Sequence, residues 1–275
     1  MSGATGLDHV GLLTRDGPAL WGVYERLGFT LTPVSRQSNE GGPLATGNRC
    51  AMLRHGYLEL LALIEPALPD NGVGRMIERF EGAHILALGM EDPEGNLARL
   101  RRAGLEIAGV APLSRPVTDD GPVAQFERLP LPDAPEGRVQ LVRHLTPDLL
   151  WQPRWTEHAN GATELREAIL VADRPAESAA RLSRLAGLAL EPDRDGGFAL
   201  PLPNGRVRVL APEVSAVILP GVEMPSRPAI AGIVLGTTDA GTTRRHLGHL
   251  PLRETPAGVM VPPSHAGGVA LVFAR

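Results

Sequence analysis

One short unit recurs along the chain, and this recurrence limits the possible folds more than any other feature of the sequence. Residues 7–13 read LDHVGLL and residues 82–88 read GAHILAL, so each apolar run has a histidine at its third position. A helix-like stretch and then a glycine follow. The glycine lies 19 residues after His9, at Gly28, and 20 residues after His84, at Gly104. Self-similarity at a fixed spacing indicates a fold built from repeated modules.

Four copies of the unit can be traced. Each unit ends with a five-residue pattern: a glycine, any residue, an aliphatic residue, a variable residue and a second aliphatic residue. The pattern starts at Gly56, Gly137, Gly205 and Gly267. Apolar strands are expected to open the units at 7–13, 82–88, 165–171 and 230–235. Apolar residues at helical spacing predict helices at 18–27, 93–103 and 175–186, and a shorter helix is expected at 240–247. Alternating or turn-bounded segments predict further strands at 28–32, 49–53, 123–129 and 197–202, so each unit has one strand, one helix and about three strands.

Composition narrows the class of protein. The chain has 275 residues, of which 43% are hydrophobic, enough for one large or two ordinary domains with a packed core. The net charge is −4 and no extended basic run occurs, so nucleic-acid binding is not expected. Cys50 is the only cysteine, which excludes an internal disulfide and thiolate metal clusters. With no leader-like N-terminus and no membrane-length apolar segment, a cytoplasmic protein without membrane contacts is expected.

The strand–helix–three-strand unit resembles the module of the vicinal oxygen chelate superfamily, which includes glyoxalase I, extradiol dioxygenases and fosfomycin-resistance proteins. Residues 7–10 resemble the first strand of these proteins. The segment 144–162, with His144, Trp151 and His158, is similar to bacterial glyoxalase-like proteins of unassigned activity. The resemblance implies an α+β fold in which four βαβββ modules form two paired, cup-shaped glyoxalase-like domains. Residues 1–150 would form the first domain (modules 5–65 and 80–147). Residues 160–275 would form a degenerate second domain (modules 162–213 and 227–275).

The resemblance also implies a metal site in the first domain. Metal ligands in this superfamily commonly come from the first and last strands of each module, which by position are His9, Glu59, His84 and Gln140. Such a set suits a divalent Mn, Fe, Ni, Co or Zn ion and leaves room for two adjacent substrate oxygens. Structural roles stay open for each residue: a histidine can be a packing residue, Glu59 can face solvent, and Gln140 can be a pocket wall.

Other polar residues are candidates around this site. Glu59 could act as both ligand and general base. His144 lies four residues beyond Gln140, about 13 Å along a strand, so both cannot easily reach one ion. His144 could instead serve as a proton shuttle, line the pocket mouth, or replace Gln140 in another register. The predicted substrate-binding residues are Arg54, Arg138, Arg143 and Trp151, although Trp151 could also pack with Trp155 and His158.

The second domain lacks these groups. Its corresponding positions hold Glu167, Arg208, Ala231 and Ala270, so no metal is expected there and Glu167 could pair with Arg208.

Three functions remain open. The leading hypothesis is a metal-dependent glyoxalase-like enzyme of the lyase or isomerase type, which binds a small oxygen-bearing substrate bidentately. The alternatives are an Fe(II)-dependent ring-cleaving dioxygenase and a non-catalytic small-molecule binding or resistance protein. The partner is a small molecule in each case, and a homodimer could form.

Overall fold

The strands of the chain form two sheets of eight strands each in the computed structural model, which describes residues 3–118, 120–131 and 134–274. The strands of the first sheet are β1 (Gly6–Thr14), β2 (Ser35–Asn39), β3 (Gly42–Met52), β4 (Tyr57–Leu63), β5 (Gly82–Gly89), β6 (Ala111–Pro116), β7 (Val123–Pro130) and β8 (Arg138–His144). Those of the second are β9 (Ala162–Val171), β10 (Glu191–Pro192), β11 (Phe198–Leu202), β12 (Gly205–Leu210), β13 (Ala229–Thr237), β14 (Arg253–Thr255), β15 (Gly258–Val261) and β16 (Ala270–Ala274). The first sheet closes into a barrel in the order β1-β4-β3-β2-β6-β7-β8-β5. The second stays open, in the order β10-β11-β12-β9-β13-β16-β15-β14.

Each sheet is built from two copies of the predicted βαβββ module. The closing strand of every module lies parallel to its opening strand, in the pairs β1–β4, β5–β8, β9–β12 and β13–β16. The two opening strands of a sheet pair antiparallel with each other, β1 with β5 and β9 with β13. This arrangement confirms the predicted α+β fold of four modules in two glyoxalase-like halves.

The helices begin where local sequence signals place them. The helices are α1 (Gly17–Arg26), α2 (Val73–Arg79), α3 (Pro93–Arg102), α4 (Pro175–Ala186), α5 (Pro212–Ile218) and α6 (Ala240–Leu247). Asp16 and Asp92 cap α1 and α3, since their side chains accept hydrogen bonds from the backbone N–H groups of Ala19 and Gly95 at 2.9 and 2.8 Å. Gly187 ends α4 with a left-handed φ of 68°. The four predicted helices are therefore confirmed to within a residue or so. None of the helices in the described residues is long and apolar enough to cross a membrane.

One local expectation was wrong. Residues 28–32 form no strand, because the N–H of Phe29 bonds to the end of α1 and that of Thr30 bonds to the His158 ring at 3.0 Å. Helix α5 covers the start of residues 215–227, which link the third module to the fourth. Both prolines of this link, Pro220 and Pro225, follow the helix and do not interrupt it.

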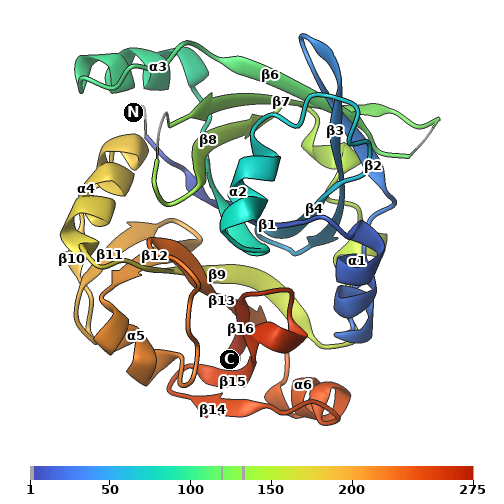
Figure 1. The fold of residues 1–275 in the computed structure, drawn as a ribbon, viewed down its shortest axis with the longest axis vertical. Coiled ribbons are helices and arrows are strands. Elements are labelled where there is room, and N and C mark those ends of the chain that lie inside the picture. Colours follow the sequence, from blue (N-terminus) through green and yellow to red (C-terminus); the bar gives the residue numbers. More distant parts are fainter. Residues whose placement is uncertain (1–2, 119, 132–133, 275) are drawn as a thin grey trace.

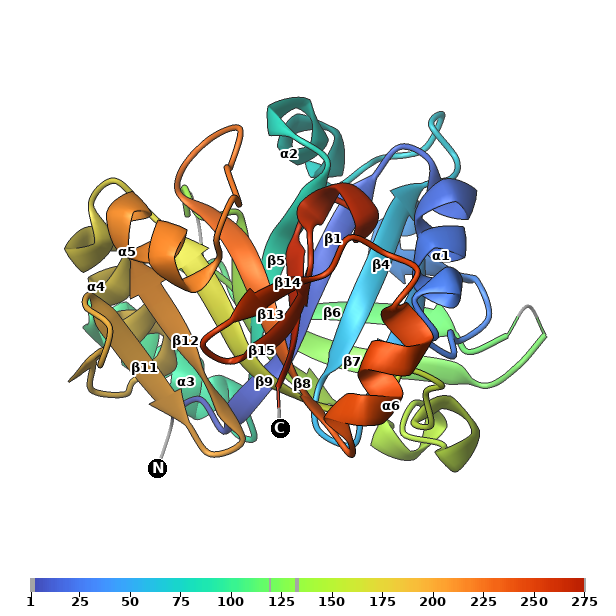
Figure 2. The ribbon, with the colours of Figure 1, turned by 90° about the horizontal axis from the view of Figure 1, so that it is seen from below.

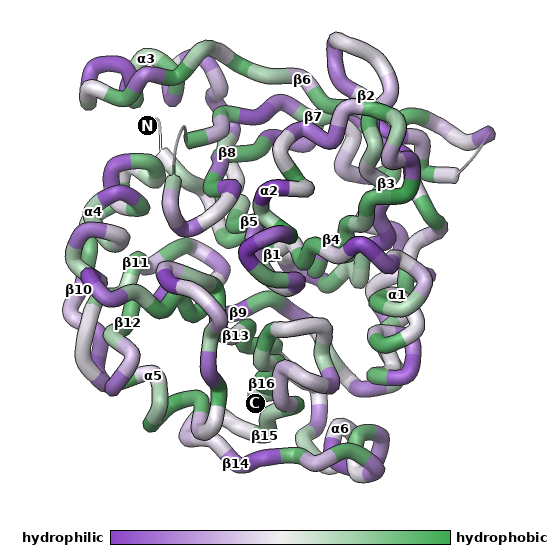
Figure 3. The backbone as a smooth tube through the Cα atoms, in the orientation of Figure 1, coloured by the Kyte–Doolittle hydropathy of each residue, from purple (hydrophilic) through white to green (hydrophobic). Residues whose placement is uncertain are grey.

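The two sheets share one hydrophobic core. The barrel and the open sheet lie side by side, with α1, α3, α4 and α6 around the outside (Figures 1 and 2). Leu12 and Leu60 of the barrel belong to the same buried cluster as Leu165 and Leu170 of β9. The apolar strands run through the middle of the molecule, while the polar segments lie mostly at its edges (Figure 3). Part of the outer face of the barrel is thus covered by packing against the open sheet.

Helix α2 covers part of the barrel interior. Its Val73 and Ile77 pack against Leu13, Leu61 and Ile85, which come from three barrel strands. Because apolar side chains fill this side, the polar side chains that point inward gather in the remaining space.

Candidate functional site

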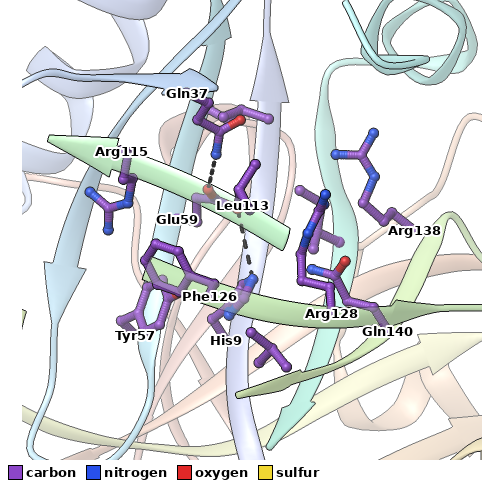
Figure 4. A pocket seen from close by; sticks show the side chains of 13 residues that line it. His9, Gln37, Tyr57, Glu59, Leu113, Arg115, Phe126, Arg128, Arg138 and Gln140 are labelled. Atoms are coloured by element: carbon purple, nitrogen blue, oxygen red, sulfur yellow. Dashed lines mark hydrogen bonds and ion pairs between the residues drawn. The ribbon is translucent and has the colours of Figure 1, made fainter. Parts of the chain in front are cut away.

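A small, largely enclosed cavity lies inside the barrel, and most of its polar wall comes from strands far apart in the sequence (Figure 4). Its volume is about 30 Å³, room for roughly two water-sized atoms. The polar and aromatic lining residues are His9, Gln37, Tyr57, Glu59, Arg115, Phe126, Arg128, Arg138 and Gln140. The cavity therefore contains three of the four residues expected to bind a metal.

His9 is held in one orientation by its neighbour Asp8. The Nδ1 atom of His9 lies 2.6 Å from Oδ1 of Asp8, and the ring stacks on Tyr57 with centroids 4.5 Å apart. A carboxylate at Nδ1 favours the tautomer that carries its proton there, which leaves Nε2 as the free acceptor. This Nε2 lies 3.8 Å from Oε2 of Glu59, on the cavity side (Figure 4).

Glu59 points into the barrel and not to solvent. Only 7% of the residue is exposed, and its Oε1 accepts hydrogen bonds from Nε2 of Gln37 at 3.1 Å and Nδ2 of Asn48 at 2.6 Å. With Oε1 occupied in this way, Oε2 is the oxygen that faces His9. The two amide donors were not anticipated from the sequence, although Gln37 and Asn48 lie in the stretch between the first helix and the closing strand.

Gln140 lines the same cavity and has an unsatisfied polar atom. Its side-chain Oε1 is buried and accepts no hydrogen bond from the described residues. A buried amide oxygen without a donor is costly, so it is available to a ligand.

His84 does not join these residues. Its Nε2 lies 2.7 Å from the carbonyl oxygen of Phe80, its ring lies 4.1 Å from the Phe80 ring, and it is absent from the cavity wall. Burial, assisted by the nearby charge of Arg79, lowers the pKa of His84, while the bond to Phe80 opposes this change. The ring is thus favoured in its neutral form and packs outside the cavity.

The strand register explains this difference. Glu59 on β4 is paired with Gly11 on β1, and the cavity histidine lies two residues before Gly11. Gln140 on β8 is paired with Ala87 on β5, and two residues before Ala87 is Ile85. Ile85, and not the histidine before it, is therefore the counterpart of the first histidine, and its side chain lines the cavity. A slip of one residue along a strand exchanges the inner face for the outer face.

The described part of the chain contains no group of three or more His, Cys, Asp or Glu side chains placed to hold one metal ion. Of the four expected ligands, the cavity has one imidazole, one carboxylate and one amide, and the fourth position is aliphatic. Arg115, Arg128 and Arg138 line the same space, so cationic groups outnumber the single carboxylate.

His144, Arg54 and Trp151 lie together in a second pocket, outside the barrel cavity. This outer pocket of about 370 Å³ also includes Asp8 in its wall. The Nε2 atom of His144 lies 3.1 Å from Oδ2 of Asp8, so one carboxylate joins His144 to His9. Burial acts to raise the pKa of Asp8, but the charges and hydrogen bonds of His144 and His9 outweigh it and hold the pKa well below its usual range. Asp8 is therefore a stable anion between two rings.

The predicted substrate-binding arginines do not lie together in one pocket. Arg138 lines the barrel cavity, whereas Arg143 is exposed and lies 3.6 Å from Glu127. Sequence reasoning missed Arg115 and Arg128. The alternation of residues along β7 was the signal that could have identified Arg128, because its side chain lies on the same inner face as Phe126.

The second half holds an ion-pair network in place of this site. Glu167 and Arg208 occupy the strand positions of His9 and Glu59, because Arg208 is paired with Ile169 as Glu59 is paired with Gly11. Arg208 lies 3.9 Å from Glu167 and 2.6 Å from Asp193. Ala231 and Ala270 belong to a buried apolar cluster with Ile218 and Leu219.

Comparison with known proteins places these observations in a family. A family model described as a glyoxalase-like domain matches residues 7–186. A search of curated proteins found no match.

The solved structures that resemble the chain share its fold at low sequence identity. A hypothetical protein from Staphylococcus aureus is 11% identical, with a TM-score of 0.67 over 97% of this chain and 98% of that one. A mutant 4-hydroxymandelate synthase from Streptomyces coelicolor is 15% identical, with a TM-score of 0.59 over 93% and 78%. A Mn(II)-bound glyoxalase from Novosphingobium aromaticivorans is 13% identical, with a TM-score of 0.54 over 99% and 82%. With the family model matching well over half of its length, the chain belongs to the glyoxalase-like domain family, within the vicinal oxygen chelate superfamily.

Proposed function

We propose that the barrel cavity is the active site of a glyoxalase-like lyase or isomerase, which moves a proton next to the carbonyl group of a small oxygen-bearing substrate. The observation that carries this proposal is the Asp8–His9 pair, whose free Nε2 faces the cavity beside Glu59. An imidazole oriented by a buried carboxylate is a common arrangement for a general base.

The chemistry follows from the groups around His9. Its Nε2 takes the proton from the carbon next to the carbonyl, and the electron pair of the broken C–H bond moves onto the carbonyl oxygen. The resulting imidazolium is stabilised by Asp8 on one side and by Glu59 on the other. The negative charge on the substrate oxygen lies among the arginine cations of the cavity wall. In a hydroxy-carbonyl substrate, return of the proton to the former carbonyl carbon, with the hydroxyl proton of the first carbon passing to the enolate oxygen, completes an isomerisation. Departure of a heteroatom group with the electron pair of its bond to the next carbon completes a lysis.

His144 acts in this scheme as a positioning residue. It contacts Asp8 and lies in the outer pocket, so it fixes the carboxylate that orients His9.

The residues of the cavity do not fit the four-ligand metal centre expected from the superfamily. Ile85 takes the place of the second histidine, and three arginines surround the remaining donors of His9, Glu59 and Gln140. No step of the proposed reaction is therefore assigned to a metal. The same observation disfavours a ring-cleaving dioxygenase, which would require a second imidazole at the iron.

Deuterium exchange tests the proposal. Small hydroxy-carbonyl and oxo compounds are incubated with the protein in D₂O, and loss of the proton next to the carbonyl is followed by NMR. We expect His9→Ala to reduce exchange by about 100-fold or more, in keeping with the contribution of a general base. His84→Gln is the matched control, because His84 lies outside the cavity and its loss should leave exchange within about twofold. Equal exchange rates in the wild type and His9→Ala would refute the assignment.

Metal analysis of untagged protein provides the second test. We expect clearly less than one divalent ion per chain. A stoichiometric ion that is lost in both His9→Ala and Glu59→Ala, but retained in His84→Gln, would overturn the metal-free scheme.

A further inference from the structure

In the described residues, neither Arg128 nor Arg138 of the cavity wall forms an ion pair with a carboxylate, although the charges of Glu59 and Asp70 act on Arg138 from a distance. Arg128 is only 9% exposed, and its buried Nε has no hydrogen-bond partner in the described residues. Arg138 donates one hydrogen bond to the backbone oxygen of Asn71, at 2.5 Å. The acidic residue in the wall of the same cavity is Glu59, whose Oε1 is already engaged. Burying a guanidinium without a partner is costly, so such a group is expected to have a ligand.

The position of the two arginines suggests where such a ligand enters. Arg128 and Arg138 line the barrel cavity and also a larger pocket of about 590 Å³ on the other side. The larger pocket is bounded by the turn between β2 and β3 and by residues 108–112, and Glu40 is its acidic residue. Arg128, Arg138 and Gln140 lie on one side of the cavity, across from Tyr57 and Arg115 (Figure 4). The two arginines therefore lie at the passage between the open pocket and the enclosed cavity.

We propose that Arg128 and Arg138 bind the anionic group of the substrate, and that the substrate is a small carboxylate or phosphoryl compound whose oxygen-bearing carbon lies next to that group. Guanidinium groups match the paired oxygens of carboxylate and phosphate. The cavity beyond them has a volume of about 30 Å³, which limits the reacting end to a few heavy atoms. Gln140 Oε1 is available to accept a hydrogen bond from a hydroxyl of the same ligand.

This inference rests on the proposed function for the identity of the reacting group, but its binding step can be measured without turnover. Isothermal titration calorimetry is carried out with inorganic phosphate, with pyruvate, and with neutral pyruvamide. We expect one saturable site per chain for at least one of the two anions, and binding of pyruvamide at least about 10-fold weaker than that of pyruvate. Removal of a charged hydrogen-bonding partner in Arg128→Met should weaken anion binding by about 10- to 100-fold.

Three variants make the result decisive. Arg143→Met removes an exposed arginine of the same barrel and should leave binding within about twofold of the wild type. Arg128→Lys keeps the positive charge and should retain part of the affinity, which separates loss of charge from loss of folding. His9→Ala should still bind the anion within about threefold. Anion binding by the wild type without proton exchange would refute the proposed function and leave the anion site standing.

The titrations have outcomes that support the anion site and outcomes that exclude it. Preference for phosphate over pyruvate, or the reverse, supports the anion site and identifies its source as phosphoryl or carboxylate. Unchanged affinity in Arg128→Met, or no saturable binding of either anion to the wild type at millimolar concentrations, overturns the proposal.

Discussion

Replacing Arg128 by methionine should stabilise the protein while it removes ligand binding. Burial, together with the charge of Arg138, lowers the pKa of Arg128 from 12.5 to about 10, although Glu59 acts in the opposite direction. At about 1.4 kcal/mol for each tenfold change in proton affinity, this is roughly 3 kcal/mol against the charged form in the folded state. Near neutral pH the arginine is charged in both states, so the folded state bears this cost.

Methionine fills a similar space without a charge. Exchanges of buried ionic groups for well-packed apolar ones stabilise proteins by about 1–4 kcal/mol in known cases. Arg128→Met should therefore raise the free energy of unfolding by about 1–3 kcal/mol. The measurement is urea unfolding at neutral pH and low salt, followed by tryptophan fluorescence, since urea does not screen charges as a guanidinium salt would.

Arg143→Met is the control for this experiment. Arg143 is exposed and its ion pair with Glu127 spans 3.6 Å, so its loss should change stability by less than about 1 kcal/mol. If Arg128→Met instead loses about 1 kcal/mol or more, Arg128 must gain from its surroundings in the free protein. No bound anion would then be needed to account for the buried charge of Arg128.

Three further changes test other parts of the structure. Asp8→Asn should lower the turnover number by about 100-fold or more, with little change in substrate affinity, because His9 loses the group that sets its tautomer; equal turnover would show that Asp8 does not orient the base. Ile85→His should raise Co²⁺ affinity at least about 10-fold, read from the absorption of the bound ion, because it supplies the second imidazole of the metal set; no gain would mean that Ile85 is not the counterpart of His9. The lowered pKa of His84 means that the unfolded chain binds a proton more readily, so stability is highest above about pH 6.5 and falls as the pH decreases below it. Urea unfolding of His84→Gln should show a smaller loss over this range, and an equal loss would exclude His84 as a source.

The fold could be predicted from the sequence because its signals are local and repeated. Apolar runs, capping aspartates such as Asp16 and Asp92, and the glycine that ends α4 act within a few residues, and each module repeats them. Repetition then implies pairing, since one module cannot bury its own apolar face. The inward orientation of Glu59 was implied by the resemblance to the superfamily, because alternation along the closing strand left both faces open.

The position of the second histidine shows where such reasoning fails. The spacing from histidine to glycine differs by one residue between the first two modules, and this difference was the available signal. Asp92 caps α3 as Asp16 caps α1, and Ile85 precedes Asp92 by the same seven residues that separate His9 from Asp16. An alignment on the helix caps would have placed Ile85, and not His84, inside the barrel.

By itself, the sequence determined the modules, their order, and the candidate groups His9 and Glu59. The tertiary structure alone decided which other side chains meet them. Closure of the barrel brings Arg115, Arg128 and Arg138 from three strands to one cavity, and folding brings His144 to Asp8 across 136 residues. The reason is geometric, because side chains alternate between the two faces of a strand. A local sequence pattern does not determine which face points inward or which side chains become neighbours. Both depend on the strand register, which forms only when distant strands pair.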